Sequence, residues 1–430
     1  MAIPTKIMRM HTYRGPSDVD ITELTELIDT EEFQRLKRVN QVSCIDHIYP
    51  DANHKRFSHV LGTGYLAKQS NPVLGLDERD SRLNFAYANT HDIGHGPESH
   101  EWEIAIHDIT GVDHKQKGIE RIRSKNVRKA VEGMGVKIED LEAMHTRENP
   151  LHKVVSSRVG LDKLDYIERD AYFCSKGAKM DIERIVNHMI FDGKNYAIDE
   201  RARDDVKLFL DAMVSAYHEI YLVKALQIVR TMLSRAICYS IQDKSLDPEK
   251  GWDMDDYQLK ECLEKSSSEA ARGLMRRLGS RDFLKTAGVI KLDGCREYEP
   301  IKGKPITVEC INRQDKDAFG GKYGKIQNLT RLEERIAKDL GFQKGEVLLS
   351  IPPTLEVSNA GSDVLIRRKG SRDDLFDSGL RSIYGVFPGL KEHLLTQTEN
   401  QYAIRMLVPG ESRERVYGIL EEKGMKRFLF

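Results

Sequence analysis

The stretch from Arg203 to Ile241 constrains the fold most strongly, because apolar side chains recur along it at helical spacing. The series opens at positions i, i+3, i+4 and i+7 with Val206, Phe209, Leu210 and Met213. A pattern of this kind is typical of an amphipathic helix that buries one face in a core or a subunit interface. We therefore predict one long helix here, in a protein that consists mainly of helices.

Helical periodicity continues over most of the first two thirds of the chain. It predicts further helices over residues 30–42, 58–69, 81–91, 125–134, 139–145 and 162–175. Asp29 and Thr30 are candidate caps for the first of these helices. Gly62 and Gly64 would allow the second to pack closely against a neighbour. A small hairpin is predicted over residues 189–198.

The pattern changes after about Lys291, where short β-like runs separated by Gly, Pro and Asn replace the helical periodicity. We predict strands over residues 306–311, 347–351, 363–368 and 403–408, and helices over 329–340 and 411–423. The stretch from Asp317 to Gly324 holds three glycines and is predicted to be a mobile loop. The chain is thus predicted to contain a helical domain, residues 1–290, and a smaller α+β domain, residues 291–430.

Composition narrows the range of partners. The 67 Lys and Arg residues nearly cancel the 68 Asp and Glu residues, so bulk charge does not indicate a nucleic-acid partner. The six cysteines include no C-x-x-C pair, which argues against a disulfide framework or a cysteine zinc site. The first residues lack an apolar signal segment, and no run of about 18 apolar residues occurs. We expect a cytoplasmic protein without a membrane partner.

Residues 91–100 carry the most distinctive chemistry, since they hold three histidines and two carboxylates. Asp92 offers hard oxygen and His91 offers borderline nitrogen, a mixture that suits Mg, Mn, Fe, Co, Ni or Zn without distinguishing them. Two adjacent side chains cannot fill a coordination sphere, so further ligands must come from elsewhere. His59 and Asp162, each near the start of a predicted helix, are the candidates.

A second polar feature lies on the predicted helix over residues 162–175. Asp162, Tyr166 and Asp170 stand at i, i+4 and i+8, which places them on one helix face. Two carboxylates and a phenol along one stripe fit neither a core-facing nor a solvent-facing surface. The stripe is typical of the wall of a polar cleft.

Four ordered blocks carry a resemblance to a known family: Ile28 to Arg38, His54 to Gly64, His91 to His100 and Asp162 to Asp170. On these blocks the sequence resembles the HD-domain phosphohydrolases, and within them the deoxynucleoside triphosphate triphosphohydrolases. A lone His-Asp pair carries little weight, but four blocks with their polar residues in register carry much more. The resemblance implies a mainly α fold, with a helical HD-domain core and a smaller α+β C-terminal region.

The resemblance also implies roles for individual residues of this sequence. The implied metal ligands are His59, His91, Asp92 and Asp162. The implied catalytic group consists of three histidines and an acidic residue that orients one of them: His95, His100, His114 and Glu103. The implied substrate-binding residues contact the phosphates, the sugar or the rest of the cleft, and are Gln41, Arg56, Lys163, Tyr166, Asp170, Tyr221 and Lys224.

The implied activity is hydrolysis of a dNTP to a deoxynucleoside and tripolyphosphate. It requires one divalent metal ion per site, and a second magnesium ion could accompany the triphosphate. His100, with Glu103 behind it, is expected to donate a proton to the leaving 5′-oxygen. The resemblance further implies a homo-oligomer, either a dimer or a tetramer, and a nucleotide activator.

Two other functions stay open at this point. An HD phosphohydrolase could act on another phosphoester, such as a nucleoside monophosphate, a signalling nucleotide or a nucleic-acid end. A nucleotide-sensing or nucleic-acid-binding module with little turnover is the third reading, and the intact set of metal ligands counts against it.

Several positions depart from the family pattern. Glu98 stands where relatives usually carry an aromatic side chain, and we expect its carboxylate near the metal and the incoming polyphosphate. Met213 and Val223 replace polar residues, so we expect an incomplete phosphate-binding set. Lys37, near Asp29, replaces an arginine of the family's activator site, which argues against guanine recognition there.

Overall fold

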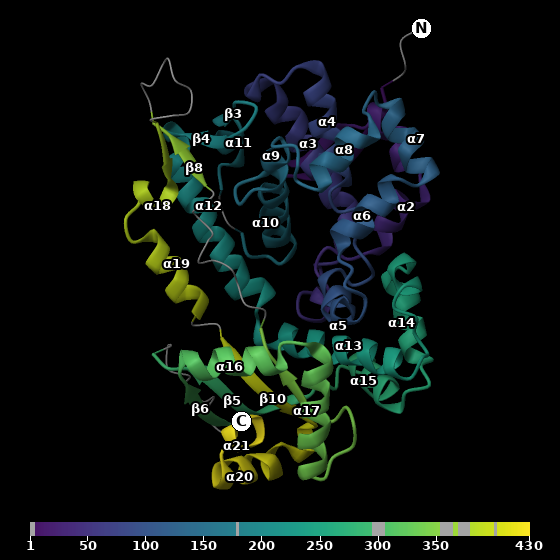
Figure 1. The fold of residues 1–430 in the computed structure, drawn as a ribbon, viewed down its shortest axis with the longest axis vertical. Helices are drawn as coiled ribbons and strands as arrows, with labels where there is room; N and C mark the ends of the chain where they lie inside the picture. Colours follow the sequence, from purple (N-terminus) through teal and green to yellow (C-terminus); the bar gives the residue numbers. More distant parts are fainter. Residues whose placement is uncertain (1–4, 178–179, 295–305, 353–363, 369–378, 400–401) are drawn as a thin grey trace.

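The structure is a computed structural model that describes residues 5–177, 180–294, 306–352, 364–368, 379–399 and 402–430. Helices dominate it, as predicted, and the strands within these ranges form one hairpin and two four-stranded sheets (Figure 1). Most helices of the first 216 residues occupy the upper part of Figure 1, and a sheet flanked by helices forms the lower part. No helix within the described ranges is long and apolar enough to cross a membrane.

The helical part is built around α3 (Arg56–Leu74), which packs against α4 (Glu78–Thr90) and α10 (Leu161–Phe173). An N-terminal hairpin, β1 (Ile7–Thr12) and β2 (Gly15–Asp20), lies beside them. The other helices here are α1 (Thr25–Ile28), α2 (Glu31–Arg35), α5 (His100–Thr110), α6 (His114–Ile122), α7 (Lys125–Gly133), α8 (Ile138–His145), α9 (His152–Ser156), α11 (Ile182–Val186), α12 (Arg203–Ala216), α13 (Lys224–Gln242), α14 (Asp256–Glu264) and α15 (Glu269–Gly279).

Two glycines of α3 set how closely its neighbours approach. A Cβ atom built on Gly62 would lie 1.9 Å from Asp165 Oδ1 of α10, and one built on Gly64 would lie 2.3 Å from Asn89 Nδ2 of α4. Any larger side chain would push these helices apart. The close packing predicted for the two glycines is confirmed.

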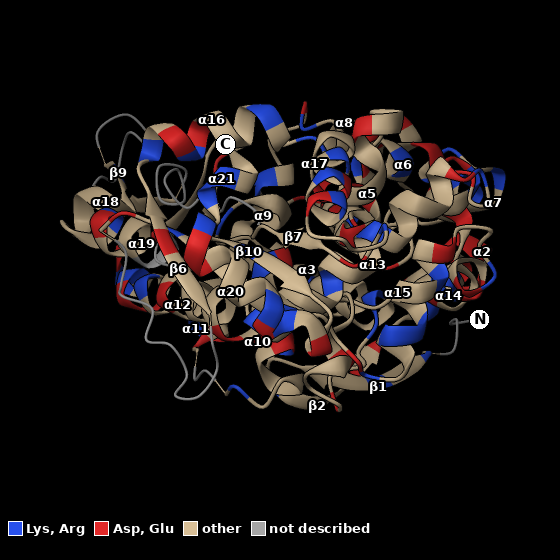
Figure 2. Ribbon diagram, turned by 90° about the horizontal axis from the view of Figure 1, so that it is seen from below, with Lys and Arg blue, Asp and Glu red and all other residues tan. Residues whose placement is uncertain are grey.

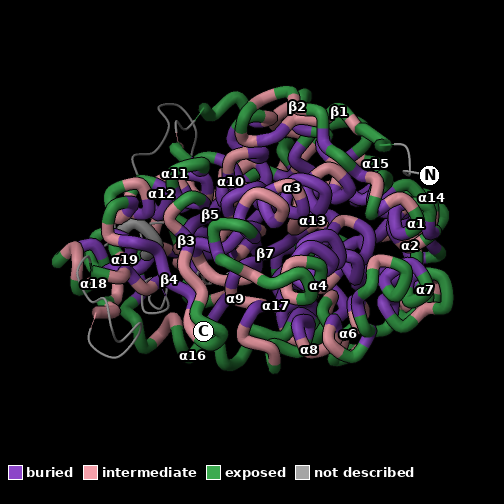
Figure 3. Tube along the Cα trace, turned by 90° about the horizontal axis from the view of Figure 1, so that it is seen from above, coloured by how far each residue is buried: buried purple, intermediate pink, exposed green. Residues whose placement is uncertain are grey.

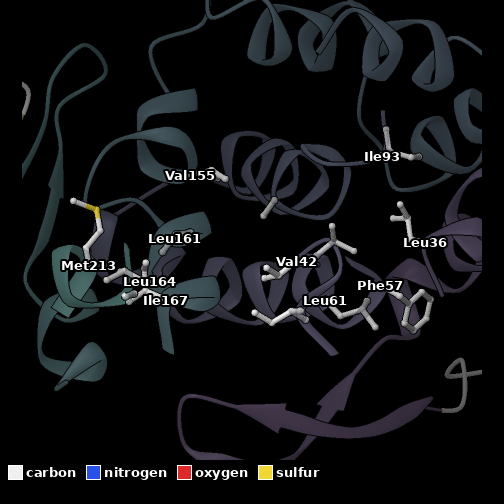
Figure 4. Packing of buried hydrophobic residues seen from close by; sticks show 14 of the residues in the cluster. Leu36, Val42, Phe57, Leu61, Ile93, Val155, Leu161, Leu164, Ile167 and Met213 are labelled. Atoms are coloured by element: carbon white, nitrogen blue, oxygen red, sulfur yellow. The ribbon is translucent and has the colours of Figure 1, made fainter. Parts of the chain in front are cut away.

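The apolar core of the helical part forms between α3, α10 and the elements around them (Figures 3 and 4). Leu61 of α3 and Leu164 and Ile167 of α10 are at most 1% exposed. Burial of each such side chain stabilises the fold by roughly 1.5–3 kcal/mol. The core therefore fixes α3 and α10 relative to each other, and with them the polar side chains that the two helices carry.

The predicted helix over residues 30–42 is shorter than expected. Thr30 caps α2, its hydroxyl accepting a hydrogen bond from Phe33 N at 3.3 Å, and a 3-10 turn continues to Arg38. The chain is extended from Val39, and Gln41 N donates to His54 O at 3.1 Å. This backbone pairing outweighs helical propensity and places Gln41 beside the start of α3.

The prediction of one long helix from Arg203 to Ile241 is wrong. Helix α12 ends at Ala216, residues Tyr217–Tyr221 form a π-helical turn, and α13 begins only after an extended residue at Val223. Leu222 N donates to Tyr217 O at 2.8 Å, five residues back. The apolar series crosses the break because α12 and α13 pack on the same core, so periodicity alone could not detect it.

The C-terminal sheet has the strand order β6–β5–β10–β7. Its strands are β5 (Lys285–Leu292), β6 (Thr307–Ile311), β7 (Leu348–Ser350) and β10 (Ala403–Val408). Helices α16 (Arg313–Tyr323), α17 (Ile326–Asp339), α20 (Arg413–Lys423) and α21 (Lys426–Leu429) accompany it. The predicted strands at 306–311, 347–351 and 403–408 are thus present, whereas β5 was not predicted.

The stretch from Asp317 to Gly324 is not the mobile loop that its glycines suggested. It forms most of α16, whose N-cap Asn312 accepts a hydrogen bond from Asp315 N at 2.8 Å. Phe319 and Tyr323 are buried against the sheet. Their burial stabilises the helix despite the low helix propensity of glycine.

Part of the C-terminal chain returns to the helical part. Strands β8 (Leu365–Arg367) and β9 (Leu380–Ser382) join the predicted hairpin of β3 (Met189–Phe191) and β4 (Tyr196–Asp199) in one sheet. Helices α18 (Ile383–Val386) and α19 (Leu390–Glu399) follow them, on the left of Figure 1. The domain boundary at 290/291 stays a prediction, and strand β5 runs across it.

A buried ion pair joins α13 to the C-terminal sheet. Arg235 Nε and Nη2 donate to the two carboxylate oxygens of Glu333 at 2.7 and 2.8 Å, and both side chains are at most 3% exposed. Glu333 Oε1 also accepts from Leu349 N of β7 at 2.8 Å. The pair therefore connects three elements, α13, α17 and β7, by hydrogen bonds between buried groups.

Replacing Arg235 alone should destabilise the fold strongly. In Arg235→Met the buried Glu333 carboxylate loses its partner, which should lower the free energy of unfolding by about 3–5 kcal/mol. The double variant Arg235→Met/Glu333→Leu should recover most of this loss, since no buried charge remains. Chemical denaturation measures the free energy of unfolding of the wild type and of both variants, with the exposed Arg128→Ala as control. Equal stability of the single and double variants would contradict this account.

Candidate active site

Four side chains from three segments meet at the predicted metal site. His59 lies on the first turn of α3, Asp162 lies on the first turn of α10, and His91 and Asp92 directly follow α4. His59 Nε2 is 3.2 Å from His91 Nε2 and 3.3 Å from Asp162 Oδ1. Asp92 Oδ2 lies 3.5 Å from His59 Nε2, and Asp92 Oδ1 lies 3.5 Å from His91 Nε2. Ligand atoms of His59, His91 and Asp162 therefore surround one point, and the Asp92 carboxylate borders it.

These separations suit a single cation. Ligand atoms about 2.1 Å from a metal stand roughly 3.0–3.4 Å apart at tetrahedral or octahedral angles. Two imidazole nitrogens and two carboxylate oxygens are a donor set that first-row transition-metal ions accept well. The residues present therefore fit one divalent cation, whose identity they do not determine.

Both imidazoles are oriented by groups behind them. His59 Nδ1 lies 2.8 Å from Asp165 Oδ2, and His91 Nδ1 lies 2.9 Å from Ala88 O. With each Nδ1 donating to these acceptors, Nε2 of both rings faces the centre as a potential ligand. Although burial opposes it, hydrogen bonds to Asp162 and Asp165 raise the pKa of His59 to about 9, so the centre attracts positive charge.

The Asp92 carboxylate also binds Arg56. Arg56 Nη1 donates to Asp92 Oδ2, and Arg56 Nε donates to Ser99 Oγ at 2.8 Å. Burial opposes ionisation of Asp92, yet the nearby His91 and Arg56 hold its pKa well below the usual range. Asp92 therefore stays a carboxylate, as a metal ligand must.

Two buried arginines fix the loop between α4 and α5. Arg121 Nη1 donates to Ile93 O at 2.9 Å, and Arg35 Nη2 donates to His95 O. A Cβ atom on Gly94 would lie 1.9 Å from His114 O, so only glycine lets α6 begin this close to the loop. The loop is thus held rigidly against α6.

This contact brings the three predicted catalytic histidines together. The rings of His95 and His114 stack with centroids 4.0 Å apart, and His100 meets His95 edge-on at 4.8 Å. Glu103 binds two of them, since its oxygens lie 2.9 Å from His100 Nδ1 and 2.6 Å from His114 Nδ1. Despite burial, these hydrogen bonds lower the pKa of Glu103, which therefore orients two histidines rather than the one expected.

The predicted polar stripe of α10 forms a wall with two further tyrosines. Asp170 accepts from the hydroxyl of Tyr221, and its other oxygen lies 2.7 Å from His54 Nε2. Tyr166 lies beside Tyr221 with ring centroids 6.5 Å apart, and Tyr217 beside Tyr221 at 5.2 Å. The π-helical turn supplies both Tyr217 and Tyr221, and such turns recur at functional sites.

A cavity of about 690 Å³ connects these groups, a size typical of small-molecule sites. Of the fifteen predicted site residues, only His59 and Lys224 are not among those lining it. His59 is fully buried directly behind the lining. Lys224 starts α13 after the helix break, and the structure does not bring it to the cavity wall.

Several lining residues were not predicted: Ser43, Tyr87, Ser99, Glu101, Ile104, Lys115, His145, Arg147, Arg158, Tyr217 and Arg230. Lys115 could have been predicted, because it directly follows His114, a predicted site residue. Arg147 and Arg158 flank α9 outside any motif, and Arg230 lies within an apolar helical pattern. Cations from unpredicted positions therefore line the cavity, and the expectation of an incomplete phosphate-binding set stays a prediction.

Glu98 does not lie where the sequence suggested. Its carboxylate accepts from Ser43 Oγ at 2.7 Å and from Cys44 N at 3.3 Å, and it does not line the cavity. The backbone is left-handed at Glu98 and Ser99, with φ of 53° and 55°, which turns the side chain away from the metal ligands. Burial and the nearby Asp256 raise the pKa of Glu98 to about 8.

The variant Glu98→Gln should change how the free energy of unfolding depends on pH, because the wild-type carboxyl is buried. A carboxyl with a folded pKa of about 8 and an unfolded value of 4.5 stabilises the fold fully below pH 4.5 and loses that contribution as pH rises to about 8. The amide has no such loss, so the variant should become relatively more stable across this window. Denaturation at a series of pH values measures it, with exposed Glu31→Gln as control, and parallel pH profiles for variant and wild type would contradict the burial.

Comparison with solved structures agrees on the fold. A phosphohydrolase from Bacteroides thetaiotaomicron matches with a TM-score of 0.69 and 19% identity, over 94% of this chain and 99% of that one. A hypothetical protein from Aquifex aeolicus matches with a TM-score of 0.69 and 20% identity, over 96% and 100%. At these identities the likeness concerns the fold alone.

Sequence relatives add the family. An uncharacterized protein of Methanocaldococcus jannaschii is 32% identical over 265 residues, 60% of this chain and 55% of that protein. The deoxynucleoside triphosphate triphosphohydrolase SAMHD1 homolog of Dictyostelium discoideum is 24% identical over 292 residues, 61% and 56%. The chain thus matches little more than half the length of these relatives. Residues 56–170 match the HD domain and residues 180–373 match the HD associated region, so the chain belongs to the HD-domain family.

Proposed function

We propose that this HD-domain hydrolase is a metal-dependent dNTP triphosphohydrolase, which converts a dNTP to a deoxynucleoside and tripolyphosphate. One observation carries the proposal: α10 lines a single cavity with a metal ligand, Asp162, and with a sugar-sized polar wall, Tyr166 and Asp170. Four residues of helix advance about 6 Å, so the stripe leads from the metal centre toward a bound nucleoside.

The residues around the centre are suited to hydrolysis at the α-phosphorus. A divalent cation held by His59, His91, Asp92 and Asp162 would polarise a phosphate oxygen and activate water. Arg56 and Lys163 line the cavity beside this set and offset charge on the phosphates. The attack forms a bond from water oxygen to the α-phosphorus and breaks the bond from that phosphorus to the 5′-oxygen.

The leaving 5′-oxygen needs a proton, and His100 is placed to supply it. Its side chain is 64% exposed to the cavity and solvent, while Glu103 holds its Nδ1. The Glu103 carboxylate would stabilise the charged imidazole before the transfer. His114 shares Glu103 and stacks on His95, so these two rings complete the wall around the phosphates.

The sugar wall supports a nucleotide over a smaller phosphoester. Gln41 lines the cavity and its buried Oε1 has no partner in the described part of the chain, so it can accept from a ligand hydroxyl. Asp170 is held in place by His54 and Tyr221 and can accept a further hydrogen bond. The Tyr166 ring lies along the wall between Asp162 and Asp170, where a 2′-hydroxyl would meet it.

The relatives named as deoxynucleoside triphosphate triphosphohydrolases also support this substrate. We extend the proposal to assembly as a homo-oligomer and to activation by a bound nucleotide, both of which the family resemblance implies. Hydrolysis assays with one nucleotide at a time, followed by assays with pairs of nucleotides, distinguish a nucleotide that is hydrolysed from one that activates the enzyme.

Product analysis tests the reaction. Metal-loaded protein incubated with each dNTP, singly and in pairs, should release deoxynucleoside and tripolyphosphate in equal amounts, since the bond to the 5′-oxygen breaks. Chromatography of the products measures both. Pyrophosphate or orthophosphate as the sole inorganic product would exclude the proposed reaction and favour another phosphoesterase activity.

The variant Asp92→Asn tests the metal centre. An amide is a poorer ligand than a carboxylate and also loses the ion pair with Arg56, so metal binding and turnover should both fall to background. Bound metal is measured by elemental analysis, and circular dichroism checks the fold. The exposed Asp51→Asn serves as control, and full turnover in Asp92→Asn would remove Asp92 from the metal centre.

A further inference from the structure

The charges that line the cavity can be paired almost completely. Figure 2 shows acidic and basic residues interleaved along the elements of the whole molecule. Inside the cavity, each lining carboxylate has a partner: Asp92 with Arg56, Glu101 with Arg230, Asp162 with Lys163, Glu103 with His100 and His114, and Asp170 with His54. Every carboxylate that lines the cavity therefore already has a cationic or imidazole partner, and Asp92 and Asp162 belong in addition to the candidate metal site.

After this pairing, Lys115 and Arg147 are left without a partner among the described residues, whereas Arg158, which also lines the cavity, does have one. Within the described ranges, no carboxylate lies at ion-pair distance from Lys115 or Arg147, and neither side chain makes a hydrogen bond. Both line the same cavity. Burial and the charge of the nearby Arg147 lower the pKa of the Lys115 amine, although the carboxylates of Asp113 and Glu103 act in the opposite direction without reaching ion-pair distance. Lys163 adds a third positive charge nearby. Unpaired like charges beside one another are unfavourable unless an anion joins them.

We infer that Lys115 and Arg147 form an anion subsite for the terminal phosphates of a polyphosphate chain, and so select a triphosphate over a monophosphate. The inference rests on the proposed function, because it assigns the end of the substrate farthest from the nucleoside. Arg147 offers a planar fork and Lys115 a point charge, the two chemistries with which proteins bind phosphate oxygens.

The backbone at Arg147 provides an independent control. Arg147 follows the end of α8 with φ of 66°, a left-handed position that glycine adopts at lower cost than any other residue. Arg147→Gly should therefore remove the side chain without lowering the melting temperature. If the Arg147 side chain served only the stability of the fold, the same substitution would lower the melting temperature.

Binding of inorganic tripolyphosphate tests the subsite without relying on turnover. Calorimetry with magnesium in excess should show that Lys115→Ala and Arg147→Gly each weaken tripolyphosphate binding about tenfold, the loss expected for one charge-assisted contact. Binding of a deoxynucleoside monophosphate should stay nearly unchanged. Lys115→Arg should retain most of the affinity, since it keeps the charge.

Matched controls come from neighbouring cations outside the cavity. Lys117 lies two residues after Lys115 and forms an ion pair with Glu120, and Arg123 forms one with Glu142. The variants Lys117→Ala and Arg123→Ala should therefore bind tripolyphosphate as the wild type does. Equal loss in the control variants would show a general charge effect and overturn the subsite.

The two proposals can fail separately. Wild-type affinity and wild-type KM for dNTP in both Lys115→Ala and Arg147→Gly would overturn the subsite while the proposed function stands. A selective loss of tripolyphosphate binding in a protein that does not hydrolyse dNTPs would support the subsite and overturn the proposed function.

Discussion

The candidate site depends on one buried carboxylate, that of Asp165. It holds His59 Nδ1 at 2.8 Å and is itself held by two hydrogen bonds from Arg169. Because α10 carries Asp165 three residues after Asp162, a single helix supplies one metal ligand and orients another. Gly62 leaves the room that this carboxylate occupies. The packing of α3 on α10 and the chemistry of the centre therefore cannot be varied independently.

Local pattern was enough to predict the part of the site that local structure determines. The stripe of Asp162, Tyr166 and Asp170 follows from helix geometry, and it lines one cavity as expected. The helix starts that carry His59 and Asp162 were predicted within a few residues. The mainly α class and most C-terminal strands followed from the change in periodicity alone.

Features set by tertiary contact were not predictable in this way. The π-helical turn after α12 adds no change to the apolar pattern, yet it moves Tyr217 and Tyr221 onto the cavity wall. The direction of the Glu98 side chain depends on a left-handed backbone conformation that the neighbouring residue types do not predict. The glycines of α16 suggested a loop, and only the buried faces of Phe319 and Tyr323 explain a helix there.

Helix α13 touches the cavity at one end and the C-terminal sheet further along. Arg230 lines the cavity and donates to Tyr221 O at 3.2 Å, while Arg235, five residues later, binds Glu333 beside β7. The same helix packs on α5, which carries His100 and Glu103. If occupancy of the cavity shifts α13, linkage requires that docking of the sheet on α13 change the affinity of the cavity by the same free energy. The C-terminal region is therefore connected, through one helix and one buried ion pair, to a cavity that it does not line.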